Sequence, residues 1–360
     1  MPQEREKDWN RYGSTAARPQ GAMPGRATRP RSITIDIHSH VAVPQAAEFV
    51  KPHLDPAVIP LVNFATAETR ALNARQDRDR TVVMTSHDQR LADLDAMGID
   101  LQIVMCPPPQ CYYAVPLDVA VKAARIVNEG VAAYVAARPD RFAALGTVPM
   151  PDGKEAAREL ERCMTQLGFK GVQILTNVAG RELSDPAFAP FWKKAEELGA
   201  IVLIHPNGFT EAQRLSRFYF NNIIGNPLET TIALHYLIFD GVLERHPDLK
   251  IIAVHGGGYL GAYSGRIDHA WGARGDAKGD LPKPPSSYLR KIYVDSVVFT
   301  PEQLAALVTT FGADHVLMGT DYPYDMGEYD PLQHIDATAT LDATARSAIA
   351  GGNAKKLFGI

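Results

Sequence analysis

The chain has 360 residues, of which 46% are hydrophobic and 22% charged, and its net charge at pH 7 is −4. This ordinary, nearly balanced composition gives no electrostatic reason to expect a nucleic-acid or membrane partner. No stretch approaches the roughly 18 apolar residues of a membrane span, and residues 1–32 lack the apolar core of a signal peptide. Cys106, Cys111 and Cys163 have no paired metal-site spacing, and an odd number of cysteines argues against a disulfide framework. We therefore expect a cytoplasmic protein that acts on small molecules.

The first 32 residues differ in composition from the rest of the chain. They are rich in Arg, Pro and Gly and hold too little apolar surface to fold alone. We expect residues 1–32 to form an N-terminal arm, either flexible or draped on a partner subunit, and residues 33–360 to form a single catalytic domain.

Short apolar segments alternate with helical segments along that domain. This alternation is typical of βα units that build a parallel sheet. The eight strand candidates are residues 33–37, 101–105, 142–148, 171–175, 201–204, 251–254, 292–295 and 316–318. The helix candidates are residues 116–137, 153–167, 186–197, 227–244 and 301–311, four of which begin at a proline. Eight such units predict an α/β fold of the (β/α)8 TIM barrel type, with its active site where the strands end.

Residues 41–90 interrupt this alternation directly after the first strand. The segment is too long for an ordinary connecting loop. We expect it to be a small insertion that caps the mouth of the barrel.

Two histidines follow the first predicted strand at a spacing of two residues. Because side chains alternate along a strand, His38 and His40 leave it on the same face, where two imidazoles can bind one metal ion. His205, His255 and Asp321 also follow predicted strands. Imidazoles together with a carboxylate suit a zinc ion, with manganese or iron as alternatives. His255 precedes Gly256, Gly257 and Gly258, and is either a further ligand or a general base for a metal-bound water.

Four motifs occur in one order along the chain. They are His38-Ser39-His40, His205-Pro206, the run from His255 to Gly258 with Gly265, Arg266, Ile267 and Asp268, and the run from Gly319 to Tyr324. With them, residues 33–360 resemble the amidohydrolase superfamily, in the branch of 2-amino-3-carboxymuconate-6-semialdehyde decarboxylase and related metal-dependent decarboxylases. The resemblance implies that His38, His40, His205 and Asp321 bind zinc. It also implies that His255 is the catalytic histidine beside the metal-bound water. Asp321 is a further catalytic candidate, because a carboxylate beside that histidine could relay the proton.

The resemblance also implies two arginines that bind a substrate carboxylate. Arg266 matches an arginine that is supplied across a dimer interface, so we expect a homodimer or a higher homo-oligomer. The second arginine precedes the helix that begins near Arg90, and Arg75, Arg78 and Arg80 are the candidates. Counting back from Arg90 favours Arg78. A bidentate guanidinium is well suited to hold a carboxylate.

The expected activity is the non-oxidative decarboxylation of a small aromatic or muconate-type acid at one zinc ion. No lysine stands at a ligand position of the fourth strand, which favours one metal over two. Either a hydroxide adds to the substrate, or the substrate binds the metal directly while Asp321 protonates the ring carbon. The alternatives are a hydrolase or hydratase acting on a lactone, an amide or a conjugated acid, an oxygen-activating dinuclear enzyme, and a catalytically silent scaffold subunit.

Overall fold

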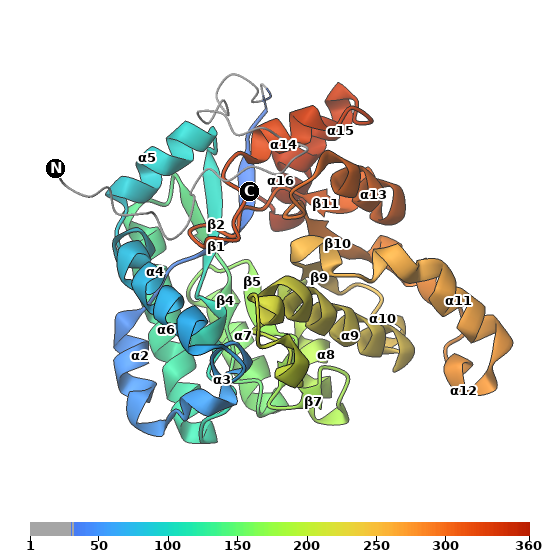
Figure 1. The fold of residues 1–360 in the computed structure, drawn as a ribbon, viewed down its shortest axis with the longest axis horizontal. Coiled ribbons are helices and arrows are strands. Elements are labelled where there is room, and N and C mark those ends of the chain that lie inside the picture. The colour runs from blue at the N-terminus through green and yellow to red at the C-terminus, as the bar shows by residue number, and fades with distance from the viewer. Residues whose placement is uncertain (1–29, 31) are drawn as a thin grey trace.

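The computed structural model describes Pro30 and residues 32–360, which form a closed parallel barrel surrounded by helices (Figure 1). The predicted arm of residues 1–32 therefore lies almost entirely outside the described residues. The barrel strands are β1 (Ile35–His40), β2 (Leu101–Met105), β3 (Phe142–Ala144), β4 (Gly146–Thr147), β5 (Gly171–Leu175), β8 (Ile201–His205), β9 (Lys250–Ala253), β10 (Ile292–Asp295) and β11 (Val316–Leu317). The fold is the predicted (β/α)8 barrel.

The strands follow one another around the barrel in chain order. β1 pairs with β2 and β2 with β3, while β4, β5, β8, β9, β10 and β11 form a second parallel series. Leu145 joins β3 to β4, and its backbone N–H donates to Val104 at 3.1 Å, so that β3 and β4 make one interrupted strand. The barrel closes beside β1, where the N–H of Ile37 donates to the carbonyl of Met318 at 3.0 Å.

The first strand contains a β-bulge. Asp36 pairs with Gln102, but Ser39 pairs with Val104, so β1 has one residue more than β2 over the same length. An extra residue of this kind shifts the side-chain alternation by one position. As a result, Ile35 and Ile37 belong to the inner apolar cluster of the barrel although His40, further along the same strand, also faces the interior.

Two apolar layers hold the barrel together. The inner cluster comes from alternate positions of the strands, such as Ile103 and Leu203, and includes Ala354 and Phe358 of α16 (Asn353–Phe358). The outer layer packs the other strand faces against the helices α6 (Leu117–Ala137), α7 (Gly153–Thr165), α8 (Ala189–Glu197), α9 (Asn226–Phe239) and α13 (Pro301–Phe311). Helix α16 contacts residues near the starts of the strands, and so closes the end of the barrel opposite the histidines.

The helix expected over residues 227–244 is broken. Helix α9 ends at Phe239, and α10 (Val242–Arg245) starts after Gly241, which has a φ of +71°. A left-handed glycine of this kind ends a helix, because its N–H can bond back to the last turn. Here the N–H of Gly241 donates to Ile238 at 3.0 Å.

Residues 41–90 contain α2 (Pro44–Val50), α3 (Pro60–Asn63), α4 (Ala67–Thr85) and the start of α5 (Asp88–Met97). The side chain of Asn221 donates to the carbonyl of Pro60 at 3.0 Å, and Gln76 donates to Asp325 at 3.3 Å. These contacts join the segment to loops that follow β8 and β11. Its role as a cap stays a prediction.

Helices α11 (Ser264–Ala273) and α12 (Gly275–Lys278) extend away from the barrel (Figure 1). Neither contains a buried residue. Across the described part of the chain, every helix is too short or too polar to span a bilayer.

Candidate metal centre

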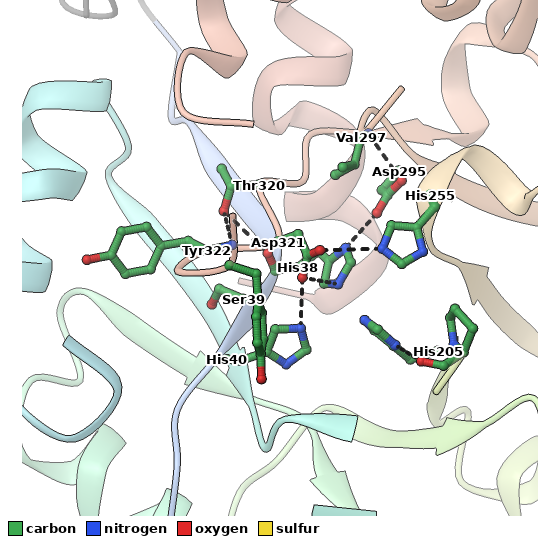
Figure 2. A network of polar contacts seen from close by, with 12 residues as sticks. His38, Ser39, His40, His205, His255, Asp295, Val297, Thr320, Asp321 and Tyr322 are labelled. Carbon is green, nitrogen blue, oxygen red and sulfur yellow. Dashed lines mark hydrogen bonds and ion pairs between the residues drawn. The ribbon is translucent and has the colours of Figure 1, made fainter. Parts of the chain in front are cut away.

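Four histidines and one aspartate converge at the ends of the barrel strands (Figure 2). The ring centroid of His38 lies 5.2 Å from that of His40, 5.0 Å from that of His205 and 5.3 Å from that of His255. The sequence predicted these residues as one site, and the structure brings all of them together.

Asp321 lies among the four imidazoles. Its Oδ1 is 3.1 Å from Nε2 of His40 and 3.4 Å from Nε2 of His38, and its Oδ2 is 3.5 Å from Nε2 of His255. The candidate ligand atoms of His38, His205, His255 and Asp321 all lie within 4.8 Å of one another. His255 is thus as well placed as the predicted ligands.

The ring nitrogens that face the centre fit a metal ion. Nε2 of His38 and Nε2 of His205 are buried and have no hydrogen-bond partner. A buried polar atom without a partner is unfavourable, and in a group of imidazoles with a carboxylate the natural partner is a divalent cation. The donor set therefore fits a divalent metal ion.

The opposite ring nitrogens are held by the surrounding protein. Nδ1 of His38 lies 2.7 Å from Oδ2 of Asp295, Nδ1 of His40 lies 3.1 Å from the carbonyl of Cys106, and Nδ1 of His205 lies 2.6 Å from the carbonyl of Pro206. Contacts with a carboxylate or carbonyl favour the tautomer with the proton on Nδ1, and so leave Nε2 free as a ligand. Sequence reasoning missed Asp295, although it ends the predicted strand 292–295.

Electrostatics favour a neutral His205 and a charged Asp321. Burial, together with the charges of His38 and His255, holds the pKa of His205 well below its ordinary value. Burial tends to raise the pKa of Asp321, but the charge of His38 and the hydrogen bonds with His255 and His40 outweigh it and hold that pKa well below its usual range. A neutral imidazole and an ionised carboxylate are the forms that bind metals.

Two residues of the site have strained backbones. His255 has a φ of +54° and Asp321 a φ of +58°, in a left-handed region that side chains larger than hydrogen rarely adopt. Such strain costs on the order of 1–3 kcal/mol per residue and is concentrated at functional sites.

The arginine candidates lie in different surroundings. Arg78 is exposed on α4, whereas Arg80 on the same helix is 7% exposed. The guanidinium of Arg80 lies 4.6 Å from the ring centroid of Tyr324, and that ring lies 5.3 Å from His40. The structure thus brings Arg80, and not Arg78, next to the centre. Arg266 is exposed on the projecting helix α11 and is not part of the site within this single chain.

A cavity of about 550 Å³ opens beside His255 and Asp321. Apolar side chains form much of its wall, among them Val297, Val298 and Met326. Such a wall suits the face of a planar, unsaturated ligand.

A family model for amidohydrolases matches residues 35–360. The chain belongs to the amidohydrolase family. It is 33% identical over 333 residues to 2-amino-3-carboxymuconate-6-semialdehyde decarboxylase of Dictyostelium discoideum, an alignment that covers 92% of each chain. Within the amidohydrolases, this relationship places the chain in the branch of metal-dependent decarboxylases.

Solved structures of amidohydrolase-fold decarboxylases are also similar. The 5-carboxyvanillate decarboxylase of Sphingomonas paucimobilis has a TM-score of 0.79 and 27% identity, covering 91% of this chain and 99% of that one. The 5-carboxyvanillate decarboxylase of Novosphingobium aromaticivorans, complexed with manganese, has a TM-score of 0.81 and 24% identity, covering 92% and 97%. The second likeness concerns the fold alone.

Proposed function

We propose that this amidohydrolase removes carbon dioxide, without oxidation, from a small aromatic or muconate-type carboxylic acid. The observation that carries the proposal is the convergence of His38, His40, His205, His255 and Asp321, in which Nε2 of His38 and Nε2 of His205 have no hydrogen-bond partner. The decarboxylase relatives support the reaction type, and the apolar wall of the adjoining cavity supports an unsaturated ring or chain as substrate.

His38, His40, His205 and Asp321 would hold the metal, which we propose to be zinc. When bound, a divalent cation supplies a Lewis acid that stabilises negative charge developing on the substrate. Manganese is the alternative, because imidazoles together with a carboxylate can also bind it. Metal analysis of the purified protein, with Asp321→Asn as the comparison, tests this assignment.

His255 and Asp321 would supply the proton that replaces the lost carboxyl group. Decarboxylation breaks the bond between the carboxyl group and a carbon atom, which keeps the electron pair and must then take up a proton. Nε2 of His255 lies 3.5 Å from Oδ2 of Asp321, close enough for the two groups to share a proton taken up at the centre. A proton held between them can be delivered to that carbon.

Two arginines would hold the departing carboxylate. Arg80 lies beside Tyr324 and the metal centre, and it replaces Arg78 as our candidate from within the chain. We propose that Arg266 reaches the site of a second copy from helix α11, which projects from the barrel. The active form would then be a homodimer or a larger assembly.

A substrate panel tests the proposed reaction. Metal-loaded protein is incubated without oxygen with hydroxybenzoic, carboxyvanillic and muconate-type acids, and carbon dioxide is measured against loss of the acid. We expect one carbon dioxide per molecule of acid consumed. Conversion of a lactone or amide substrate with uptake of water and no carbon dioxide would instead identify a hydrolase.

A further inference from the structure

The guanidinium of Arg90 is fully buried behind the metal centre. Arg90 lies on α5 and is 0% exposed. Its Nη2 donates to the carbonyl of His40 and, at 2.9 Å, to that of Val83, and its Nη1 donates to Oε1 of Gln102 at 2.8 Å. This arginine therefore contacts the backbone of a predicted metal ligand without entering the metal site.

Gln102 on β2 extends this contact to Asp36. Its Nε2 donates to Oδ2 of Asp36 at 2.7 Å. The Asp36 carboxylate also accepts from the backbone N–H of His38 and from that of Thr320, both at 3.0 Å, and from the Thr320 hydroxyl at 2.6 Å. Asp36, Gln102 and Arg90 thus form a buried chain of hydrogen bonds, which we call the relay. The relay holds the backbone at His38, His40 and Thr320, and Thr320 directly precedes Asp321.

Helix α5 also contacts the segment around Asp321 directly, through the neighbouring Tyr322. The Arg90 guanidinium lies 4.8 Å from the ring centroid of Tyr322, and the Tyr322 hydroxyl donates to Asp93 at 2.6 Å. The backbone of Tyr322 in turn accepts from the N–H of His40 at 2.8 Å. One face of α5 therefore contacts two of the three segments that carry predicted metal ligands, at the point where the barrel closes.

We propose that Arg90 is a positioning residue, which sets the separation between the His38–His40 segment and Asp321 through the relay of Gln102 and Asp36. The two segments are more than 280 residues apart in sequence. Backbone hydrogen bonds join them directly, from the N–H of Asp321 to His38 and from that of His40 to Tyr322, both at 2.8 Å, and the relay supports the same backbone from behind. A planar guanidinium with a fixed fork of donors holds several carbonyls at set distances, which a lysine cannot do. The inference rests on the proposed metal-dependent function.

Arg141 offers a matched control. It is also largely buried and donates to backbone carbonyls, those of Asp100 at 2.8 Å and Ile99 at 2.9 Å, just beyond the end of α5. It contacts none of the metal-site residues in the described contacts. Replacing the Arg141 guanidinium should destabilise the same region of the fold but leave the geometry of the predicted metal ligands unchanged.

The test measures metal binding and not turnover. Wild type, Arg90→Lys and Arg141→Lys are stripped of metal, compared by thermal unfolding and titrated with Mn²⁺ under electron paramagnetic resonance. We expect Arg90→Lys to bind Mn²⁺ about tenfold or more weakly, as substitutions around metal ligands typically do, with a changed spectrum of the bound ion. Arg141→Lys should match the wild type in both measurements, whatever its melting temperature.

If Arg90→Lys does not fold, Gln102→Met takes its place, because it cuts the relay between Arg90 and Asp36 with a side chain of similar length. Wild-type affinity and spectrum in the folded Arg90→Lys or Gln102→Met protein would overturn the inference. Equal weakening in Arg90→Lys and Arg141→Lys would overturn it too, since the effect would then be general loosening. Absence of Mn²⁺ and Zn²⁺ binding by the wild type would instead refute the metal site itself, and the inference with it.

Discussion

At the scale of single residues, Asp295 determines which nitrogen of His38 faces the centre. Its Oδ2 lies 2.7 Å from Nδ1 of His38, and its Oδ1 accepts from the N–H of Gly256 at 2.9 Å and from that of Val297 at 3.2 Å. These contacts outweigh burial and hold the pKa of Asp295 below its ordinary value, so it is an ionised acceptor.

We expect Asp295→Asn to bind the metal about 10- to 100-fold more weakly, because the ring of His38 loses its charged partner. Competition with a metal-binding dye measures the affinity. Asp314→Asn is the control, because Asp314 forms a similar contact with His315 at 3.1 Å but its side chain is 77% exposed. Equal metal affinities in Asp295→Asn and wild type would show that the Asp295 carboxylate does not affect metal binding by His38.

Arg80 and Arg78 give a second prediction at this scale. If Arg80 binds the substrate carboxylate, Arg80→Met should raise KM by about 10- to 100-fold, the equivalent of a charged hydrogen bond worth about 1.5–3 kcal/mol. Arg78→Met should leave KM unchanged, since Arg78 points to solvent. Steady-state kinetics on the accepted acid measures KM for both variants. A raised KM in Arg78→Met with an unchanged KM in Arg80→Met would assign carboxylate binding to Arg78.

The sequence predicted the five metal-centre residues because each follows a strand, and strand ends gather at one end of a barrel. It could not choose between Arg78 and Arg80. Residues two apart on a helix face different directions, and only the packing of α4 shows which of them turns inward. The sequence did not reveal the roles of Asp295, Arg90 and Asp36 for a similar reason. Their hydrogen-bond partners are distant in sequence and known only from the fold.

At the scale of elements, alternation along the first strand predicted that His38 and His40 leave it on one face, and both rings lie in the centre. Alternation would place Ile35 and Ile37 on the opposite face. The bulge between Asp36 and Ser39 turns both sets toward the interior. A one-residue shift in pairing leaves no mark in the hydrophobic pattern, and so the sequence could not reveal it.

The glycine turn after His255 has a packing role that the sequence did not show. Gly258 has a φ of +65°, and a Cβ on it would lie 2.2 Å from the carbonyl oxygen of Pro227 and 2.7 Å from Oγ1 of Thr231, both on α9. We expect Gly258→Ala to displace His255 and to lower both the melting temperature and the activity. Gly272→Ala on α11 meets no atom within 4 Å and should stabilise that helix by up to about 1 kcal/mol.

Circular dichroism melts of these two alanine variants check the prediction. Turnover of the accepted acid, measured well below the melting temperature of each, separates displacement of His255 from unfolding. Wild-type stability and turnover in Gly258→Ala would show that α9 can shift to accommodate the added methyl group without displacing His255.

At the scale of the whole molecule, the candidate metal site joins strands that are far apart in the sequence. β1, β8 and the segments after β9 and β11 each bring a predicted ligand or a proposed catalytic group, so bound metal should stabilise the folded state against the unfolded one. Free metal at about a thousandfold excess over its Kd adds roughly 4 kcal/mol.

We therefore expect a chelator to lower the thermal midpoint of the wild type and added Zn²⁺ or Mn²⁺ to restore it. His38→Ala should show neither response, because its site is incomplete. A wild-type midpoint that does not respond to chelator or metal would contradict a resident ion.

The prediction at the largest scale concerns Arg266 on helix α11, which projects from the barrel and has no buried residue. If it completes the site of a second copy, Arg266→Ala and His38→Ala should each be inactive alone. After dissociation and mixing in equal amounts, half of the dimers hold both variants. Each mixed dimer has one intact site, formed by the metal ligands of the Arg266→Ala subunit and the arginine of the other. Activity should therefore return to about a quarter of the wild-type value. Arg266 acting within its own chain would give no recovery on mixing, and an Arg266→Ala protein with full activity would remove the arginine from the site altogether.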